Sequence, residues 1–353
     1  MKKTLLIAGA ALALISCNMK NPLLTESTAP FGAPEFDKIE NEHYLPAFEQ
    51  GIAEAKAEID AIVANQDEPT FENTIEAMEY AGQTLSKVAS IFYAVMEAHT
   101  DDEKQQIAEQ ISPMLTEYSM YVSLNNDLFQ RVKAVYEKKD ELGLDQDQMT
   151  LLEDNYKSFV RGGANLSDED KAVYSKLSEE LSLTTLQFSK NVLAATNAYT
   201  LHITDSTELG GLPEFVKTMA AETAAEKGLE GWAFTLDYPS YGPFLKYSTN
   251  RELRKQVWMA YNTRAIGGEF DNTEIVKKII DLRIKIANIL GYETYADYAL
   301  EERMAKNKKT VDEFVMQLLK PSMEFAKKDV ADVLAYAKKN GFEENVLQPW
   351  DFS

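Results

Sequence analysis

Apolar residues repeat at helical spacing along most of this chain, and that pattern restricts its fold more than any other feature of the sequence. One stripe, which predicts an amphipathic helix, consists of Leu45, Phe48, Ile52, Ile59 and Ile62. Similar patterns predict further helices within 70–95, 103–138, 146–160 and 167–192. A chain patterned in this way is expected to fold mainly into packed helices.

Capping residues mark where the predicted helices begin and end. A Ser, Thr or Asp followed three residues later by an acidic residue forms a capping box. Four such pairs are Ser167-x-x-Asp170, Thr249-x-x-Glu252, Asp271-x-x-Glu274 and Thr310-x-x-Glu313. Gly291 fits the position just past a helix end. Pro321 lies inside an otherwise helical pattern, so we expect it to kink or divide the last helix.

A short region departs from the helical pattern. The segment "NAYTLHITD" alternates and is rich in β-branched residues, and "GWAFTLDYPSYGPFLKYS" indicates a strand, a Pro/Gly turn and a short return. The sequence therefore predicts a mainly α fold with a small β element around 198–247. The tyrosines of the second segment could present phenols to a ligand, and packing in a core or turn is the alternative use.

The N-terminus has the pattern of a secretory signal. Lys2 and Lys3 precede an apolar run that is too short to span a membrane, and the run ends in Leu-Ile-Ser-Cys, which resembles a bacterial lipobox. This pattern predicts that residues 1–16 are removed, that Cys17 is lipidated, and that 17–35 form a flexible tether. The expected location is the bacterial cell envelope, lipid-anchored and facing the periplasm. An ordinary secretory signal that happens to contain a cysteine is the alternative.

The charge balance argues against one class of partner. The chain has 57 acidic and 36 basic residues, which give a formal net charge of -21. A surface of this sign repels phosphate backbones, so we expect no nucleic-acid partner.

The residue types that several kinds of catalysis need are missing or badly spaced. The three histidines are His43, His99 and His202, and none begins an H-E-x-x-H pair that could hold zinc. Glu40-x-x-His43 has the spacing of a di-iron ligand pair, but no second copy occurs. The single thiol, Cys17, is assigned to the lipid, and no G-x-S-x-G elbow is present. The residues by themselves therefore assign no catalytic and no metal-binding side chain.

Several stretches resemble one family of zinc metallopeptidases, which includes thimet oligopeptidase, oligopeptidase A and the bacterial peptidyl-dipeptidase Dcp. They are "FDKIENEHYLPAFEQGIAEAKAEID", "PTFENTIEAME", "NYKSFVRGGANLSDEDK", "YSTNRELRKQVWMAYNTRA" and "LRIKIANILGYETYADYALEERMA". The match runs in order from about Phe36 to Ser353. It implies an N-terminal helical domain over 36–195, and over 196–353 the small β element and the start of the catalytic-domain region.

The resemblance also implies what this chain would lack. In the family, the H-E-x-x-H helix, the third zinc ligand and the substrate-binding Tyr and His residues lie in a later half, and no position here matches them. The chain is then expected to supply one helical wall of a channel that admits short peptides, and to be inactive alone. Its ending "LQPWDFS", where Asp351 would start a helix, fits a chain cut before the zinc motif. The alternative is a non-catalytic helical lipoprotein that acts as a peptide-binding or scaffold module.

Overall fold

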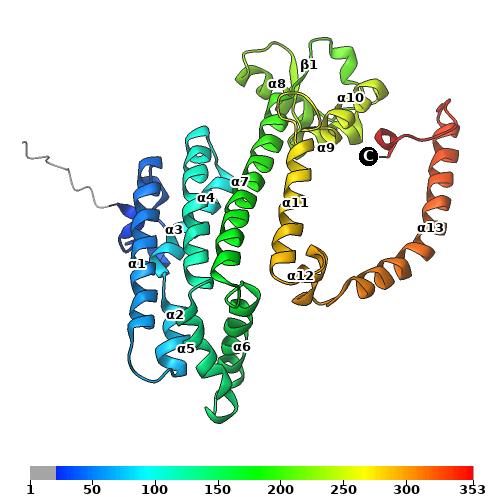
Figure 1. The fold of residues 1–353 in the computed structure, drawn as a ribbon. Coiled ribbons are helices and arrows are strands. Elements are labelled where there is room, and N and C mark those ends of the chain that lie inside the picture. Colours follow the sequence, from blue (N-terminus) through cyan, green and yellow to red (C-terminus); the bar gives the residue numbers. More distant parts are fainter. Residues whose placement is uncertain (1–20, 353) are drawn as a thin grey trace, which may run out of the picture. The chain divides into compact units, whose positions relative to one another are not determined.

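The computed structural model describes residues 21–352. The described residues form mainly α-helices with one small two-stranded sheet, which confirms the predicted fold class (Figure 1). The chain divides into two compact units: the residues up to Ile111 with Asp127–Tyr156, and Ser112–Asn126 with Lys157 onward. The sequence predicts a domain boundary between 195 and 196. The helix over Asp168–Ala198 crosses that position and lies wholly in the second unit, so the two units divide elsewhere.

The first unit is built from helices and short 3-10 turns. Its α-helices are α1 (Tyr44–Ala64), α2 (Ala77–Tyr80), α3 (Gln83–Ala98) and α5 (Asn126–Glu137), with a π-helical turn over Phe71–Glu76. Two helices run from one unit into the other, α4 (Asp102–Ser123) and α6 (Gln146–Arg161). The 3-10 turns are Pro22–Leu24, Pro30–Gly32, Phe36–Lys38, Asn41–His43 and Lys139–Glu141.

The core of the first unit lies where α1 packs along α3. Phe48 and Phe92 are fully buried, and their rings meet edge to face with centroids 5.6 Å apart. A Cβ atom at Gly51 would lie 3.0 Å from the Cα atom of Leu85, so glycine lets the two helices approach closely. The predicted stripe of α1 is therefore the face that forms this core.

The segment just before the helical body is packed against it. The side chain of Leu23 is 1% exposed, and the Asn21 amide donates to the carbonyl of His43 at 2.8 Å. The ammonium of Lys87 on α3 donates to the carbonyl of Thr25 at 3.2 Å. From Asn21 onward, part of the range for which the sequence predicts a tether is thus held on the first unit by both apolar and polar contacts.

A buried arginine fastens the loop between α1 and the π-helical turn. The guanidinium of Arg131 on α5 donates to the carbonyl of Asn65 at 2.7 Å and to the side-chain oxygen of Asn73 at 3.1 Å. Thr70 caps the turn by accepting from the backbone N–H of Asn73 at 3.2 Å. Arg131 is 9% exposed, so its hydrogen bonds replace most of its water.

The second unit contains the remaining elements. They are α7 (Asp168–Ala198), β1 (Leu201–Ile203), a 3-10 turn (Ser206–Leu209), α8 (Glu214–Glu226), β2 (Trp232–Phe234), α9 (Tyr238–Tyr247), α10 (Arg251–Asn262), α11 (Thr273–Ile289), α12 (Tyr295–Glu301), α13 (Lys308–Lys339) and a 3-10 turn (Pro349–Asp351). Helices α7 and α11 lie side by side in Figure 1 and share the most extensive helix contact of the unit. A buried Asn272 ties them together, because its amide donates to the carbonyl of Phe188 and its oxygen accepts from Asn191, each at 3.0 Å.

The β element is real but smaller than its sequence suggests. Strands β1 and β2 pair antiparallel, with Leu201 opposite Phe234. The expected return strand is wrong, since the residues after β2 form helix α9 instead. Pro239 lies in the first turn of this helix, where its missing N–H group is not needed. Phe244 and Leu245 are buried on the inner face of α9. The apolar residues of this segment therefore reach the core with helical spacing, not with the alternation of a strand.

Helix starts are correct at Ser167 and displaced at three other places. Ser167 accepts from the N–H of Asp170 at 3.1 Å. The N-caps of the later helices are asparagines, Asn250 for α10, Asn272 for α11 and Asn307 for α13, rather than the predicted Thr249, Asp271 and Thr310. The amide oxygens of Asn250 and Asn307 accept from the N–H group three residues on. Asn272 makes no such bond, and Asp271 instead accepts from the N–H of Thr273 at 3.0 Å.

The sequence predicts that Pro321 kinks or divides helix α13. The helix continues through Pro321, so the division is wrong, while Figure 1 shows the helix curving along its length. None of its residues is buried. Gly291 and Gly341 each follow a helix end with positive φ values of 88° and 91°, as predicted for Gly291.

Candidate functional site

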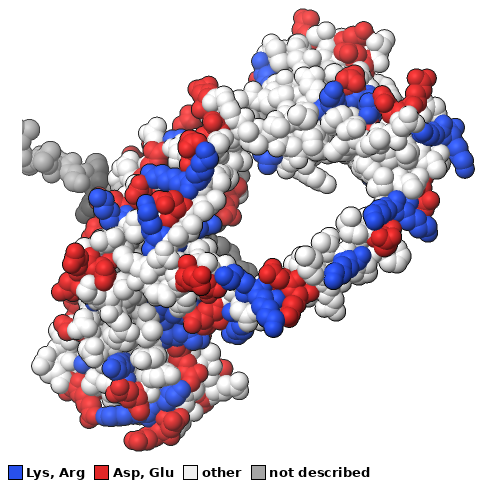
Figure 2. Space-filling view, turned by 45° about the vertical axis from the view of Figure 1, so that its right-hand side comes forward, with Lys and Arg blue, Asp and Glu red and all other residues white. Residues whose placement is uncertain are grey.

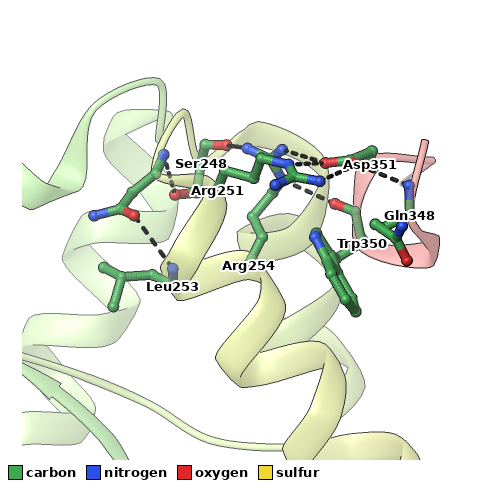
Figure 3. Close-up of polar contacts among 8 residues, drawn as sticks. Ser248, Arg251, Leu253, Arg254, Gln348, Trp350 and Asp351 are labelled. Atoms are coloured by element: carbon green, nitrogen blue, oxygen red, sulfur yellow. Dashed lines mark hydrogen bonds and ion pairs between the residues drawn. The ribbon is translucent and has the colours of Figure 1, made fainter. Parts of the chain in front are cut away.

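Two arginines lie one turn apart on the same face of α10. Arg251 is the first residue of the helix and Arg254 follows at the i+3 position, which places both guanidinium groups on one side. The side chain of Asn250 accepts from the N–H of Leu253 at 3.2 Å and so fixes where the helix begins (Figure 3). The cap therefore sets the direction in which both arginines point.

The two arginines hold the carboxylate of Asp351. Arg251 donates through Nε to Oδ1 and through Nη2 to Oδ2 of Asp351, both at 2.9 Å, and Arg254 donates through Nη2 to Oδ1 at 3.2 Å (Figure 3). The Asp351 side chain is 4% exposed. We name these three residues the Arg–Asp clasp. The parallel pair of hydrogen bonds from Arg251 is the geometry in which arginine binds carboxylates most strongly.

The clasp docks the turn at 348–351 onto α10. Arg254 also donates to the carbonyls of Ser248 at 2.8 Å and of Trp350 at 3.0 Å. The rings of Trp258 and Trp350 meet edge to face with centroids 5.7 Å apart. Residues about 100 positions apart in the sequence are thus joined by polar and aromatic contacts.

The charges of the clasp determine what it can do chemically. Burial alone would raise the pKa of the Asp351 carboxyl, but the hydrogen bonds from Arg251 and the Gln348 N–H group, with the charges of both arginines, lower this pKa below its usual value. Asp351 is therefore ionised at neutral pH. A carboxylate held in this way positions a segment and is poorly suited to donate protons.

A pocket opens beside the clasp, between α9 and α10. Its volume is about 400 Å³. We name it the aromatic pocket, and it is lined by Tyr238, Tyr241, Gly242, Leu245, Lys246, Trp258, Tyr261 and Asn262. The sequence pointed to this place through its tyrosine-rich segment, but it did not predict that α10 supplies the second wall.

Stacked tyrosines form the wall of the aromatic pocket. The rings of Tyr241 and Tyr261 are parallel within 21° at 4.1 Å, and the Arg264 guanidinium lies 3.9 Å from the centre of the Tyr261 ring. Burial and a hydrogen bond with Tyr261 raise the pKa of Tyr241 to about 12, whereas this hydrogen bond and Arg264 lower the pKa of Tyr261. The two phenols are therefore stacked on each other, with a guanidinium over the second ring.

Arg161, in one of the stretches that carry the resemblance, has a structural role. It donates to the carbonyl of Tyr298 at 2.8 Å and forms an ion pair with Glu301, which joins the end of α6 to α12. Gly163 follows with φ of 92°, and a Cβ atom there would lie 2.8 Å from the side chain of Leu166. The tight turn that follows Arg161 thus needs glycine at position 163.

The histidines take up positions that do not converge. His43 accepts through Nδ1 from the N–H of Glu40 at 2.9 Å, so the Glu40-x-x-His43 pair serves as a cap. His202 contacts the carbonyl of Glu230 through Nε2 at 2.6 Å, and His99 lines a separate hollow of about 780 Å³ in the first unit. Across residues 21–352, no group of three or more His, Cys, Asp or Glu side chains is placed to hold a metal ion.

The predicted lipidation site cannot be placed on the fold. Cys17, the signal segment 1–16 and the start of the tether lie outside the described residues. Within the part of the chain that the structure covers, no helix combines the length and the apolar character needed to cross a bilayer.

Comparison with known proteins connects these features to a family. Residues 244–353, which include both the clasp and most of the aromatic pocket, match the model of peptidase family M3. The chain is 36% identical over 337 residues to the dipeptidyl carboxypeptidase of Escherichia coli (strain K12), and these residues make up 94% of this chain and 49% of that protein. The resemblance to peptidase family M3 is confirmed.

Further curated relatives match over the same extent. Oligopeptidase A of Escherichia coli (strain K12) is 32% identical over 340 residues, 95% of this chain and 49% of that protein. The probable cytosolic oligopeptidase A of Arabidopsis thaliana is 30% identical over 341 residues, 94% of this chain and 48% of that protein. The chain spans about half the length of the curated relatives that it matches, consistent with the N-terminal half of an M3 peptidase.

Proposed function

We propose that this chain is the N-terminal part of a zinc-dependent metallopeptidase of the peptidyl-dipeptidase or oligopeptidase type, which hydrolyses short peptides. The observation that carries the proposal is the 36% identity with a dipeptidyl carboxypeptidase across 94% of this chain. Similarity of this kind extends through both compact units, so it does not come from one shared motif. Two named oligopeptidases A support the same substrate class.

The zinc of such an enzyme does not fit the side chains that the structure describes. A catalytic zinc site needs three protein ligands that converge on one point, and no such set occurs among residues 21–352. We infer that the zinc ligands and the groups acting on the peptide bond come from a segment outside these 353 residues. This chain then supplies a helical wall of the peptide-binding channel and is inactive alone.

Complementation tests this proposal. The chain is co-expressed with the C-terminal half of a dipeptidyl carboxypeptidase that carries His-Glu-x-x-His, and the two are purified through a tag on one of them. We expect a stable complex that cleaves a quenched-fluorescent short peptide and loses this activity with a chelator. In the matched control, the motif glutamate of the added half is changed to glutamine, which should keep the complex and remove cleavage.

The chain by itself supplies the second control. After dialysis it should bind no stoichiometric zinc and should cleave no peptide. Chelator-sensitive cleavage by the pure chain would contradict the proposal. If the chain ignores the added half and is soluble and monomeric, the non-catalytic peptide-binding or scaffold module becomes the better account.

We also propose that the protein is held at the membrane through a lipid on Cys17, in the bacterial cell envelope on the periplasmic side. The support is the sequence pattern of residues 1–17 alone: a charged start, a short apolar run and the Leu-Ile-Ser-Cys ending. Several acyl chains together anchor a protein stably, whereas a single chain binds membranes only marginally.

A further inference from the structure

The aromatic pocket has a composition that is unusual in this chain. Four of its eight lining residues are aromatic, and one of the others is the exposed lysine Lys246. None of these eight described residues carries a carboxylate, although the chain as a whole has a net charge of -21. The hollow in the first unit shows the contrast, since Glu40, Glu42, Asp101 and Glu103 line it.

The charge around the pocket is locally reversed. Between residues 246 and 264, the charged residues are Lys246, Arg251, Glu252, Arg254, Lys255 and Arg264. The clasp uses Arg251 and Arg254 for Asp351. Lys246 and Lys255 stay exposed, while charges of both signs are scattered over the face of the molecule that Figure 2 shows. A carboxylate near this pocket would meet a favourable field in an otherwise acidic protein.

The mouth of the pocket carries an aromatic ring that the fold does not bury. Tyr238 is 75% exposed, and its ring contacts Tyr241 edge-on at 5.7 Å. A Cβ atom at Gly242 would lie 3.6 Å from the Tyr238 ring, so the glycine leaves room beside it. A large aromatic side chain in water at the rim of a preformed cavity is a ready contact for an incoming ring.

The floor of the pocket is rigid before any ligand arrives. The ring of Tyr241 stacks on that of Tyr261, and the Arg264 guanidinium lies over the Tyr261 ring. Rigid aromatic surfaces bind with little loss of side-chain freedom, which favours affinity.

We propose that the aromatic pocket binds an aromatic side chain of an extended peptide whose neighbouring residue is acidic. The ring enters among Tyr238, Tyr241 and Trp258, and the adjacent carboxylate pairs with Lys246. The inference rests on the proposed function only in that the ligand is a peptide. The occupant follows from charge complementarity, because the pocket offers aromatic faces and a cation and no competing carboxylate.

Binding is tested with the whole chain and blocked dipeptides, followed by the fluorescence of Trp258. The probe is acetyl-Phe-Asp-amide, which has an acidic side chain and no free terminus. We expect a saturable change with a dissociation constant on the order of 1 mM, as for a small single-site ligand. Acetyl-Phe-Lys-amide and acetyl-Ala-Asp-amide should bind at least about threefold more weakly, since each lacks one of the two contacts.

Variants of exposed side chains link the signal to the pocket. Tyr238→Ala and Lys246→Met should each weaken binding about threefold to tenfold, the range expected for one aromatic or one charged contact. The matched controls are Tyr336→Ala and Lys309→Met on α13, which are equally accessible and should bind as the unchanged chain does. The fluorescence change should disappear in Trp258→Phe.

Three results would overturn the inference. They are equal binding by the charge-reversed probe, unaltered binding by both pocket variants, and no saturable change up to about 10 mM, a concentration at which even weak single-site ligands bind. These outcomes are separate from complementation, because cleavage restored without binding of the probe would leave the proposed function intact. Binding of the probe without complementation would support the binding role of the aromatic pocket and would contradict the proposed peptidase function.

Discussion

The carboxylate of Asp351 and the guanidinium of Arg251, which are 100 positions apart in the sequence, form two parallel hydrogen bonds of 2.9 Å. This pair joins the beginning of α10 to the last described turn of the chain. It also leaves Asp351 nearly without water, so the carboxylate depends on the arginines for solvation, whereas 29% of the Arg251 side chain stays exposed.

Replacement of Asp351 by asparagine should destabilise the second unit. The amide keeps the shape but cannot satisfy two guanidinium groups, so we expect the free energy of unfolding to fall by about 1–3 kcal/mol. Urea titration followed by tryptophan fluorescence measures the change, since Trp350 leaves Trp258 when the turn undocks. Glu274→Gln is the control, because its ion pair with Lys277 is exposed and should contribute less than about 0.5 kcal/mol. A loss no larger than that of the control would mean that the clasp does not hold the turn.

The contribution of Asp351 should depend on pH in a defined direction. Its pKa is lower in the folded chain than in the unfolded chain, so its stabilisation is full above an unfolded pKa of about 4 and is lost as pH falls through the folded value. The difference in unfolding free energy between the unchanged chain and Asp351→Asn should therefore be constant from about pH 7 to pH 5 and shrink below about pH 4. Other carboxyls titrate in both proteins and cancel. A difference that grows on acidification would refute this assignment.

Replacement of Arg131 by methionine should weaken the first unit. It removes the donors to the Asn65 carbonyl and to Asn73, and leaves polar groups of the 65–74 loop without these bonds. We expect a loss of about 2–4 kcal/mol in unfolding free energy, as for other buried hydrogen-bonded charges. Lys133→Met on the same helix is the control, since its exposed pair with Glu137 should change stability by less than about 0.5 kcal/mol. Equal effects of both changes would show that Arg131 is not the fastening residue.

Helix α13 should make the isolated chain self-associate. Its exposed apolar side chains include Phe314, Leu318 and Phe325, which are 59%, 52% and 69% exposed. Apolar surface of this extent usually drives association when it is bare. Changing these three residues to glutamine should shift sedimentation toward the monomer, whereas Val173→Gln on α7, which is 46% exposed, should not. An unchanged chain that is monomeric at all concentrations would contradict this prediction.

The mature protein should begin at a lipidated Cys17. Intact-mass analysis of protein extracted from membranes should show the loss of residues 1–16 and the added mass of acyl chains. Cys17→Ser should remove the added mass and release the protein from the membrane fraction. A different N-terminus, or an unmodified thiol, would favour the ordinary secretory signal instead.

Helix positions could be predicted from the sequence more reliably than helix ends. The stripe of α1 gave the correct buried face because burial itself creates the periodicity. The start of α10 was displaced by one residue, since Thr249 and Asn250 are both good caps and only the backbone conformation decides between them. Helix α9 was mistaken for a turn and a short return strand because its two prolines and its glycine, which normally end elements, fit within a single short helix.

The candidate site was largely hidden from the sequence. The i, i+3 spacing of Arg251 and Arg254 is a local signal that both face the same way, but nothing local indicates a partner near position 351. The tyrosines of α9 were visible as a cluster, whereas the pairing of Tyr241 with Tyr261 depends on how α9 and α10 pack. Contacts between distant segments are set by tertiary packing, which a single sequence does not specify.

Pro321 gives α13 two halves that need not open together. Proline has no N–H group, so the carbonyl of Gln317 does not receive the backbone hydrogen bond that residue 321 would otherwise donate. The hydroxyl of Ser322 donates to the neighbouring carbonyl of Leu318 at 2.7 Å and stabilises this turn from the side. Local opening of a helix spreads poorly past a position where a backbone hydrogen bond is missing. In an amide hydrogen-exchange experiment, the amides before and after Pro321 should therefore exchange as two separate groups with different protection.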